Sequence, residues 1–151
     1  MEALIISFPH SLLAFILYLA TSCVLLALHT KVYTIITPHD EFKLIREGKM
    51  AASIALGGSI VGFSIPLAGV VSHSLSIPDV IIWGLIASVI QLGVFFVASK
   101  IIPELSKRIE DNSVAAGLFV ATLAIAVGLL NTACMTPDDQ AQPTQVYEIH
   151  Q

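Results

Sequence analysis

Charge is scarce in this chain. Asp, Glu, Lys and Arg make up only 12% of its 151 residues, whereas hydrophobic residues make up 56%. A soluble domain of this size has no need for so much apolar surface, so the composition excludes an ordinary soluble fold. Lys and Arg together number seven, and the net charge is −4. No nucleic-acid partner is expected, because the chain lacks the basic surface that binds nucleic acid.

Charged residues are missing altogether from four long apolar runs. These runs cover residues 11–30, 50–72, 80–99 and 114–135, and the mean hydropathy of the chain is +0.86. With a rise of about 1.5 Å per residue, a helix of roughly 20 residues spans the hydrocarbon layer of a bilayer. The sequence therefore predicts an all-α membrane protein with four transmembrane helices embedded in the lipid bilayer. Because the runs show no carboxylate or base, we expect no proton relay or ion-coupling site within the membrane.

Basic residues are confined to two of the remaining segments. All seven Lys and Arg lie within residues 31–49 and 100–113, and both ends of the chain have none. The positive-inside rule places such segments in the cytoplasm. We therefore predict that these two loops are cytoplasmic and that the N- and C-termini lie on the outer side. The start of the chain has no Lys or Arg, which favours a permanent first helix over a cleaved signal peptide.

The two halves of the chain resemble each other. Ser7-Phe8-Pro9 opens the first apolar run, and Ser76-Ile77-Pro78 opens the third at the equivalent place. In both, a Ser in N-cap position is followed by Pro in the first turn of the helix. We interpret the chain as two parallel repeated helical hairpins, residues 7–72 and 76–136, because two crossings return each unit to its starting side. Residues 1–136 would form one transmembrane domain, followed by a polar, disordered outer tail, 137–151.

The first basic loop has the pattern of a short surface helix. Thr37 is the expected N-cap, Pro38 falls in the first turn, and Gly48 ends the helix before the chain enters the bilayer. Residues 103–109 predict a smaller version in the second loop. His39-Asp40-Glu41 contains metal-ligand residue types, but three consecutive residues point in different directions. A capping role is therefore favoured, and no metal site is expected.

Small residues recur on the second and fourth apolar runs. Lipid gives apolar helices no hydrophobic reason to associate, so close backbone packing holds them together, and small residues permit it. We expect the second and fourth helices to cross tightly through Ala51, Ala55, Gly58, Gly62, Gly117, Ala121, Ala124 and Gly128. Pro66 removes one backbone hydrogen bond of the second helix and predicts a kink there.

Three polar residues lie at or beyond the expected middle of the membrane. Gln91 is the strongest candidate for a structural or functional polar contact, because an unpaired amide in hydrocarbon costs several kcal/mol. Ser59 and Asn131 are the others. Hydrogen bonds between helices are one reading of these residues. A midplane substrate site or an oligomer contact is the alternative.

Other chemistries are disfavoured by what is missing. The two cysteines, Cys23 and Cys134, fall at different expected membrane depths, so a disulfide between them is not expected. The sequence has no Walker loop, nucleophile elbow or potassium-channel filter motif. We therefore expect no enzyme, no catalytic residue and no cofactor.

Several short motifs taken together carry a resemblance to a known family. They include Thr37-Pro38-His39, Met50-Ala51-Ala52-Ser53, Val89-Ile90-Gln91-Leu92 and Asn131-Thr132-Ala133-Cys134. Over residues 7–136 the chain resembles the YjfL-like family of small bacterial inner-membrane proteins, which are formed by a duplicated two-helix domain of unknown function. The resemblance implies an inner-membrane location and four helices, and it supplies no catalytic residues.

These observations leave two functional hypotheses. The first is a non-enzymatic inner-membrane protein that acts through a homo-oligomer or a membrane-protein partner. The second is a small oligomeric transporter or channel with a midplane polar site at Gln91, which would need several subunits because four helices enclose little space.

Overall fold

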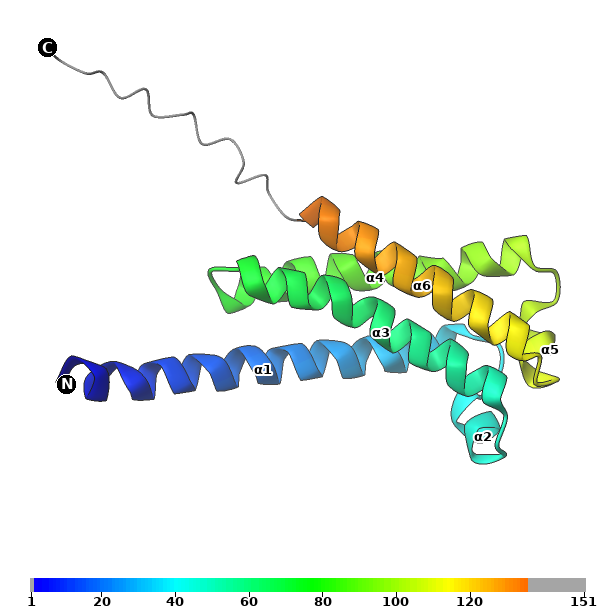
Figure 1. The fold of residues 1–151 in the computed structure, drawn as a ribbon, viewed down its shortest axis with the longest axis horizontal. Helices are drawn as coiled ribbons and strands as arrows, with labels where there is room; N and C mark the ends of the chain where they lie inside the picture. The colour runs from blue at the N-terminus through cyan, green and yellow to red at the C-terminus, as the bar shows by residue number, and fades with distance from the viewer. Residues whose placement is uncertain (1, 136–151) are drawn as a thin grey trace, which may run out of the picture.

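The computed structural model describes residues 2–135, which form six helices and no strand (Figure 1). Four helices are long enough and apolar enough to cross a membrane. The prediction of an all-α protein with four spans is confirmed. The helices are α1 (Glu2–Ile36), α2 (Glu41–Arg46), α3 (Met50–His73), α4 (Ile77–Ile101), α5 (Leu105–Glu110) and α6 (Val114–Met135). The predicted tail, 137–151, lies outside the described residues.

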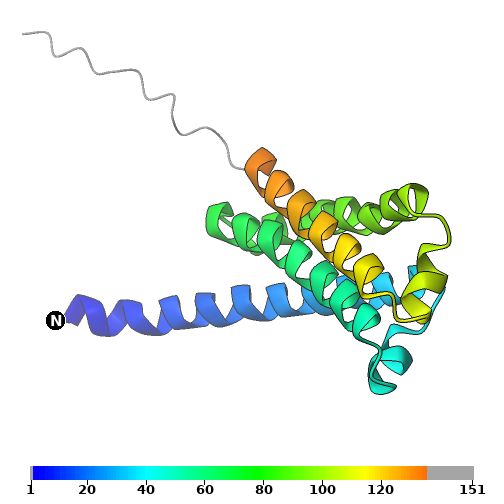
Figure 2. The same cartoon turned by 45° about the vertical axis from the view of Figure 1, so that its right-hand side comes forward.

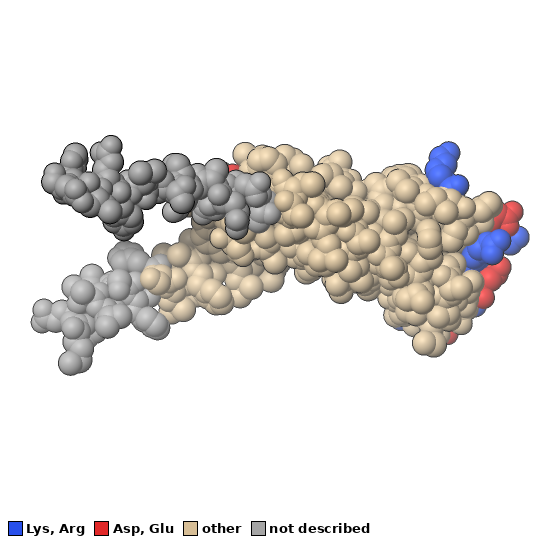
Figure 3. Space-filling view, turned by 45° about the horizontal axis from the view of Figure 1, so that its top comes forward, with Lys and Arg blue, Asp and Glu red and all other residues tan. Residues whose placement is uncertain are grey.

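The order of the helices is the same in both halves, with a long, a short and a long helix in each. The internal duplication itself stays a prediction. The first span is longer than its apolar run, because α1 continues through Lys31 to Ile36. The short helices α2 and α5 lie together at one end of the bundle. Lys and Arg side chains gather at that same end of the molecule (Figures 1 and 3).

The start of α2 differs from the prediction. Its N-cap is Asp40, whose carboxylate accepts a hydrogen bond from the Lys43 backbone N–H at 3.0 Å. The predicted cap, Thr37, instead donates its hydroxyl to the Tyr33 carbonyl and belongs to the end of α1. The N-cap prediction at Thr37 was therefore wrong by three positions. Gly48 has a φ of +80°, which suits the turn that leads from α2 into α3.

The packing of α3 on α6 is the most extensive contact between helices. The two helices cross closely along their length (Figures 1 and 2). A Cβ added at Gly58 would overlap the Ala121 backbone, and one added at Gly117 would overlap the Ala51 carbonyl. Gly128 in turn lies against the carbonyl of Gly62. The structure thus brings both small-residue stripes together.

Two further members of the stripes, Ala55 and Ala124, are also buried. Pro66 is buried within α3, and the helix continues through it from Met50 to His73. The backbone bond that Pro66 cannot make would have gone to the Gly62 carbonyl. That carbonyl faces Gly128 across the helix contact, in a place where only a residue without a side chain fits.

The first helix stands apart from this core. It contacts α3 and α4 through its second half and diverges from the bundle toward its N-terminus (Figure 2). Leu12, Leu13, Phe15 and Ile16 are all exposed along the diverging part. The buried side chains of α1, which are Leu25, His29 and Tyr33, lie instead in its second half.

Candidate functional site

Gln91 is buried inside the bundle, with 2% of its surface exposed. Its side-chain nitrogen Nε2 donates a hydrogen bond of 2.7 Å to the Ala124 carbonyl on α6. The amide occupies the space that a side chain at Gly62 would need. Gln91 therefore links α4 to both α3 and α6. Its carbonyl oxygen Oε1 has no hydrogen-bond partner.

His29 is a buried base that the sequence analysis missed. It lies on α1 with 1% exposure. Its Nδ1 is 2.9 Å from the Ser88 hydroxyl on α4, and its Nε2 is 3.3 Å from the Ser59 hydroxyl on α3. Its ring stacks on Phe63, with centroids 4.2 Å apart. The expectation that the membrane runs contain no base was therefore wrong, because it considered Lys and Arg and overlooked histidine.

The contacts of His29 make it a structural link between three helices. A neutral imidazole offers one donor and one acceptor, and a hydroxyl can serve either role, so Ser59 and Ser88 match both tautomers. Ser59, a predicted polar candidate, thus has His29 as its partner. Asn131 is buried on α6 and its Nδ2 lacks a partner. Among the described residues, no hydrogen bond joins Gln91, Ser59 and Asn131 to one another.

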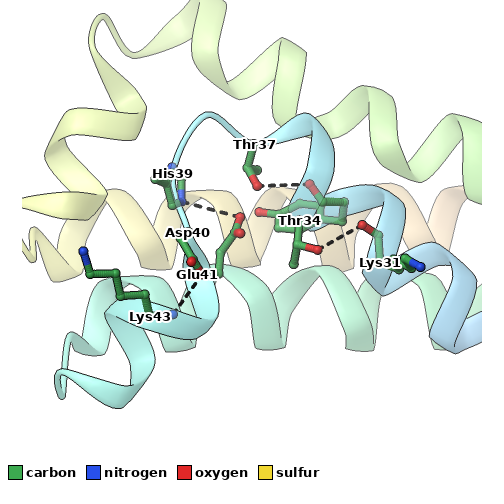
Figure 4. A network of polar contacts seen from close by, with 8 residues as sticks. Lys31, Thr34, Thr37, His39, Asp40, Glu41 and Lys43 are labelled. Carbon is green, nitrogen blue, oxygen red and sulfur yellow. Dashed lines mark hydrogen bonds and ion pairs between the residues drawn. The ribbon is translucent and has the colours of Figure 1, made fainter.

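A second polar cluster lies where α1 ends and α2 begins. His39 Nε2 and Glu41 Oε1 are 3.6 Å apart, and the two side chains are 1% and 0% exposed. Figure 4 shows both side chains on one side of the segment, while Asp40 turns away to cap α2. The expectation that His39 and Glu41 point in different directions was therefore wrong for these two residues. Tyr33, 3% exposed, lies nearby, since its ring and the His39 ring both face Phe95.

Most side-chain polar atoms of this cluster make no hydrogen bond. In the described part of the chain, the buried side-chain atoms without hydrogen bonds include both ring nitrogens of His39, both carboxylate oxygens of Glu41 and the Tyr33 hydroxyl. Each buried polar group left unsatisfied costs about 1–3 kcal/mol, and a charged group costs more. Native structures satisfy such groups with ordered water or an ion. This cluster is therefore the strongest candidate for a binding site in the described chain.

Apolar packing holds the cluster in place from the side of the bundle. Phe95 of α4 meets the Tyr33 ring at 5.9 Å and the His39 ring at 6.3 Å between centroids. Tyr33 and Phe95 belong to a buried hydrophobic core that also includes Leu105 and Ile109 of α5. The polar side chains consequently sit on a rigid apolar wall.

A pocket opens beside the cluster at the end of the molecule. Its volume is about 320 Å³. The charged and polar residues around it come from α2, from the loops beside it and from the end of α5: His39, Asp40, Lys43, Glu47 and Glu110. His39 is thus both part of the buried cluster and part of the pocket wall. No three His, Cys, Asp or Glu side chains converge as a metal-binding group anywhere in residues 2–135.

The fold and these contacts define the class of protein: a small multi-pass membrane protein of four spans, tied together by buried polar side chains. A family model described as Domain of Unknown Function (DUF350) matches residues 7–135, and the chain belongs to this family. The resemblance predicted from its short motifs is therefore confirmed.

Two relatives show how far the similarity extends. The chain is 43% identical to the UPF0719 inner membrane protein YjfL of Escherichia coli (strain K12) over 126 residues, 83% of this chain and 96% of the relative. It is 28% identical to the UPF0719 transmembrane protein YshE of Bacillus subtilis (strain 168) over 118 residues, 74% of this chain and 84% of the relative. No solved structure matches the chain.

Proposed function

We propose that this protein is a non-enzymatic component of the bacterial inner membrane that acts as a homo-oligomer. The inner-membrane location is supported by the name of the YjfL relative and by the four apolar helices. In the proposed orientation the α2 and α5 loops face the cytoplasm and both termini lie outside. The gathering of basic side chains at the α2 and α5 end supports this orientation (Figure 3).

The exposure of α1 is the observation that carries the oligomer proposal. Only 6% of the most apolar stretch of this span is buried, against 50% for α3. Its outer half leaves a groove of about 320 Å³ beside α3, lined by Ser22, Ser64, Ala68 and Ser72 among others. Small residues in such a groove allow the backbone of another helix to approach closely, which is what drives helix association in lipid. We assign this groove to α1 of a second copy.

Cysteine cross-linking between two differently tagged copies tests this arrangement. Cys23 and Cys134 are exposed and are first replaced by Ser. One copy then carries Leu19→Cys and the other Ala68→Cys, because Leu19 lies one helical turn from Ser22 and reaches the depth of Ala68 in a parallel copy. Oxidation of native membranes should give a mixed dimer.

The matched control pairs Val89→Cys on α4 with the same Ala68→Cys partner. Val89 is 70% exposed, but it lies on a different helix from the proposed contact. This pair should cross-link at least tenfold less. Equal yields from the two pairs, or no mixed dimer from either, would refute the assignment of the groove to a second copy.

A small oligomeric transporter or channel is the second candidate function. The unpaired Oε1 of buried Gln91 favours it, because a free acceptor deep in a bundle can bind a polar solute. Flux of labelled solutes into vesicles that contain the protein tests it. Flux that Gln91→Leu abolishes without loss of assembly would favour the transporter, and unchanged flux would exclude a role for Gln91 in it.

A further inference from the structure

A groove lies between α1, α2 and α3 on the surface of the bundle. Its volume is about 450 Å³, and small-molecule sites in proteins typically hold about 300–1,000 Å³. Six of the residues around it lie on one face of α1, between Cys23 and Thr34. Phe42 of α2 and Ile60 of α3 form the rest of the wall. This groove is distinct from the one that we assign to a second copy, because the two share no lining residue.

The groove has the length of one membrane leaflet. Cys23 lies at the middle of the span Ser11–Ile36. From Cys23 to Thr34 the helix advances eleven residues, which is about 16 Å at roughly 1.5 Å per residue. Half of the hydrocarbon layer of a bilayer is about 15 Å thick. The groove therefore reaches from the centre of the membrane to its surface at the α2 end of the bundle.

The lining of the groove changes from apolar to polar along this length. On α1 it is apolar as far as Ala27 and polar from Thr30 to Thr34. A glycerophospholipid has the same order, because its acyl chain ends at the membrane centre and its phosphodiester lies at the surface. Any lipid tail can cover the apolar part of the groove. The polar end therefore decides which headgroup is favoured.

Lys31 gives the polar end a positive charge. It is the only charged side chain among the described residues that line the groove. In the described chain the ion pairs join other side chains, so Lys31 has no carboxylate partner there. Figure 4 shows its side chain turned away from the His39–Glu41 pair. At the edge of the hydrocarbon an adjoining anion stabilises such an ammonium, which is why basic pockets between membrane helices bind anionic lipid headgroups.

Thr30 and Thr34 supply hydrogen-bond acceptors beside this charge. Thr30 Oγ1 donates to the Leu26 carbonyl at 2.9 Å, and Thr34 Oγ1 donates to the Lys31 carbonyl at 2.9 Å. A hydroxyl oxygen that donates its proton still accepts through its lone pairs. The polar end therefore suits a headgroup that combines an anionic phosphate with hydroxyl donors. A choline headgroup fits it less well, because choline brings a fixed cation and no donor.

We propose that this groove holds one anionic glycerophospholipid, of the phosphatidylglycerol kind, from the leaflet at the basic end of the bundle. One acyl chain lies along α1 toward Cys23, and Lys31 donates hydrogen bonds to the phosphodiester. The headgroup hydroxyls donate to Thr30 and Thr34. A single protein chain forms the whole groove, so lipid binding is independent of the proposed oligomer.

Photo-cross-linking of the full chain in phosphatidylcholine vesicles tests the site. The vesicles contain a trace of either phosphatidylglycerol or phosphatidylcholine, with the same acyl chains and a diazirine at the end of one of them. Mass spectrometry then locates the adducts. We expect phosphatidylglycerol adducts on α1 between Cys23 and Ala27. They should be about fivefold more abundant than phosphatidylcholine adducts, because one basic residue near the membrane surface contributes about that preference for an anionic lipid.

Two pairs of variants separate the charge from the shape of the groove. Lys31→Gln should reduce phosphatidylglycerol labelling of α1 about fivefold. Lys100→Gln is its matched control and should leave the labelling unaltered, because Lys100 is exposed in the last turn of α4 but lies outside the groove lining. Ala27→Phe fills the groove and keeps Lys31, and it should abolish the preference for phosphatidylglycerol. Val89→Phe, at a position of α4 that is 70% exposed, should preserve that preference.

Three results would overturn the site. Equal labelling of α1 by the two lipids in the unmodified chain, a measurement that needs no variant to fold, would show that the groove has no headgroup preference. Equal effects of Lys31→Gln and Lys100→Gln would show that Lys31 acts only as one surface charge among several. Loss of labelling when inorganic phosphate replaces chloride at equal ionic strength would assign Lys31 to a soluble anion instead of a lipid.

Discussion

Adding one methyl group at Gly58 should weaken the bundle, whereas adding it at Gly57 should not. In Gly58→Ala the new Cβ would overlap the Cα and Cβ of Ala121, and neither atom can rotate away. Inserting a methylene into a packed interior costs about 1–3 kcal/mol. Alanine regains about 0.5–1 kcal/mol over glycine within a helix. We expect a net loss of roughly 1 kcal/mol, and at most about 2.5 kcal/mol, in the free energy of unfolding for Gly58→Ala.

The neighbouring glycine provides the matched control. A Cβ at Gly57 would meet nothing within 4 Å, so Gly57→Ala should be neutral or stabilise by up to about 1 kcal/mol. Reversible unfolding in mixed micelles, followed by circular dichroism, measures both variants under the same conditions. If Gly58→Ala proved as stable as Gly57→Ala, the contact between α3 and α6 could not be the close backbone contact described above.

Further predictions follow from the buried polar contacts and the membrane orientation. Gln91→Leu removes the amide together with its unpaired oxygen and fills similar volume, so unfolding free energy should change by about 1 kcal/mol or less in the same micelle assay. His29→Phe keeps a ring on Phe63 but loses two hydrogen bonds. It should lower the free energy of unfolding by only about 1 kcal/mol, because the freed serine hydroxyls can bond to carbonyls of their own helices. A loss above roughly 3 kcal/mol would contradict that compensation. Asn112→Gly keeps the positive φ of 63° but removes the 3.0 Å hydrogen bond to the Ala51 N–H, and thermal unfolding should show a loss of about 1 kcal/mol. In a cysteine-free background, Glu47→Cys should be shielded from an impermeant thiol reagent in intact cells and Gln142→Cys should react; the reverse pattern would refute the proposed orientation.

The membrane spans could be predicted from the sequence because hydrophobicity and length alone define them. Four uncharged apolar runs gave four helices, although α1 extends past Thr30 to Ile36. Lys31 does not end that helix, because a long side chain can carry its charge to the membrane surface. The stripes of small residues also predicted which two helices pack together, because only small side chains let two helix backbones approach closely.

The buried polar contacts could not be predicted, because each depends on which helices become neighbours. His29 finds hydroxyl partners on α3 and α4, which are far from it in the sequence. The convergence of His39 and Glu41 depends on where α2 begins. Once Asp40 is the N-cap, the residues on either side of it both turn toward the bundle (Figure 4). Because the sequence analysis predicted that the helix begins after Thr37, it did not predict that His39 and Glu41 face each other.

Counting subunits in native membranes tests the proposed homo-oligomer without any variant of the chain. Chains fused at the C-terminus to a fluorescent protein that matures in the periplasm are captured in lipid nanodiscs straight from the membrane, without detergent, and their bleaching steps are counted one particle at a time. We expect two or more steps in most particles, and fewer steps when Ala68→Phe fills the groove beside α1. Single-step particles throughout, at expression levels close to natural ones, would contradict it.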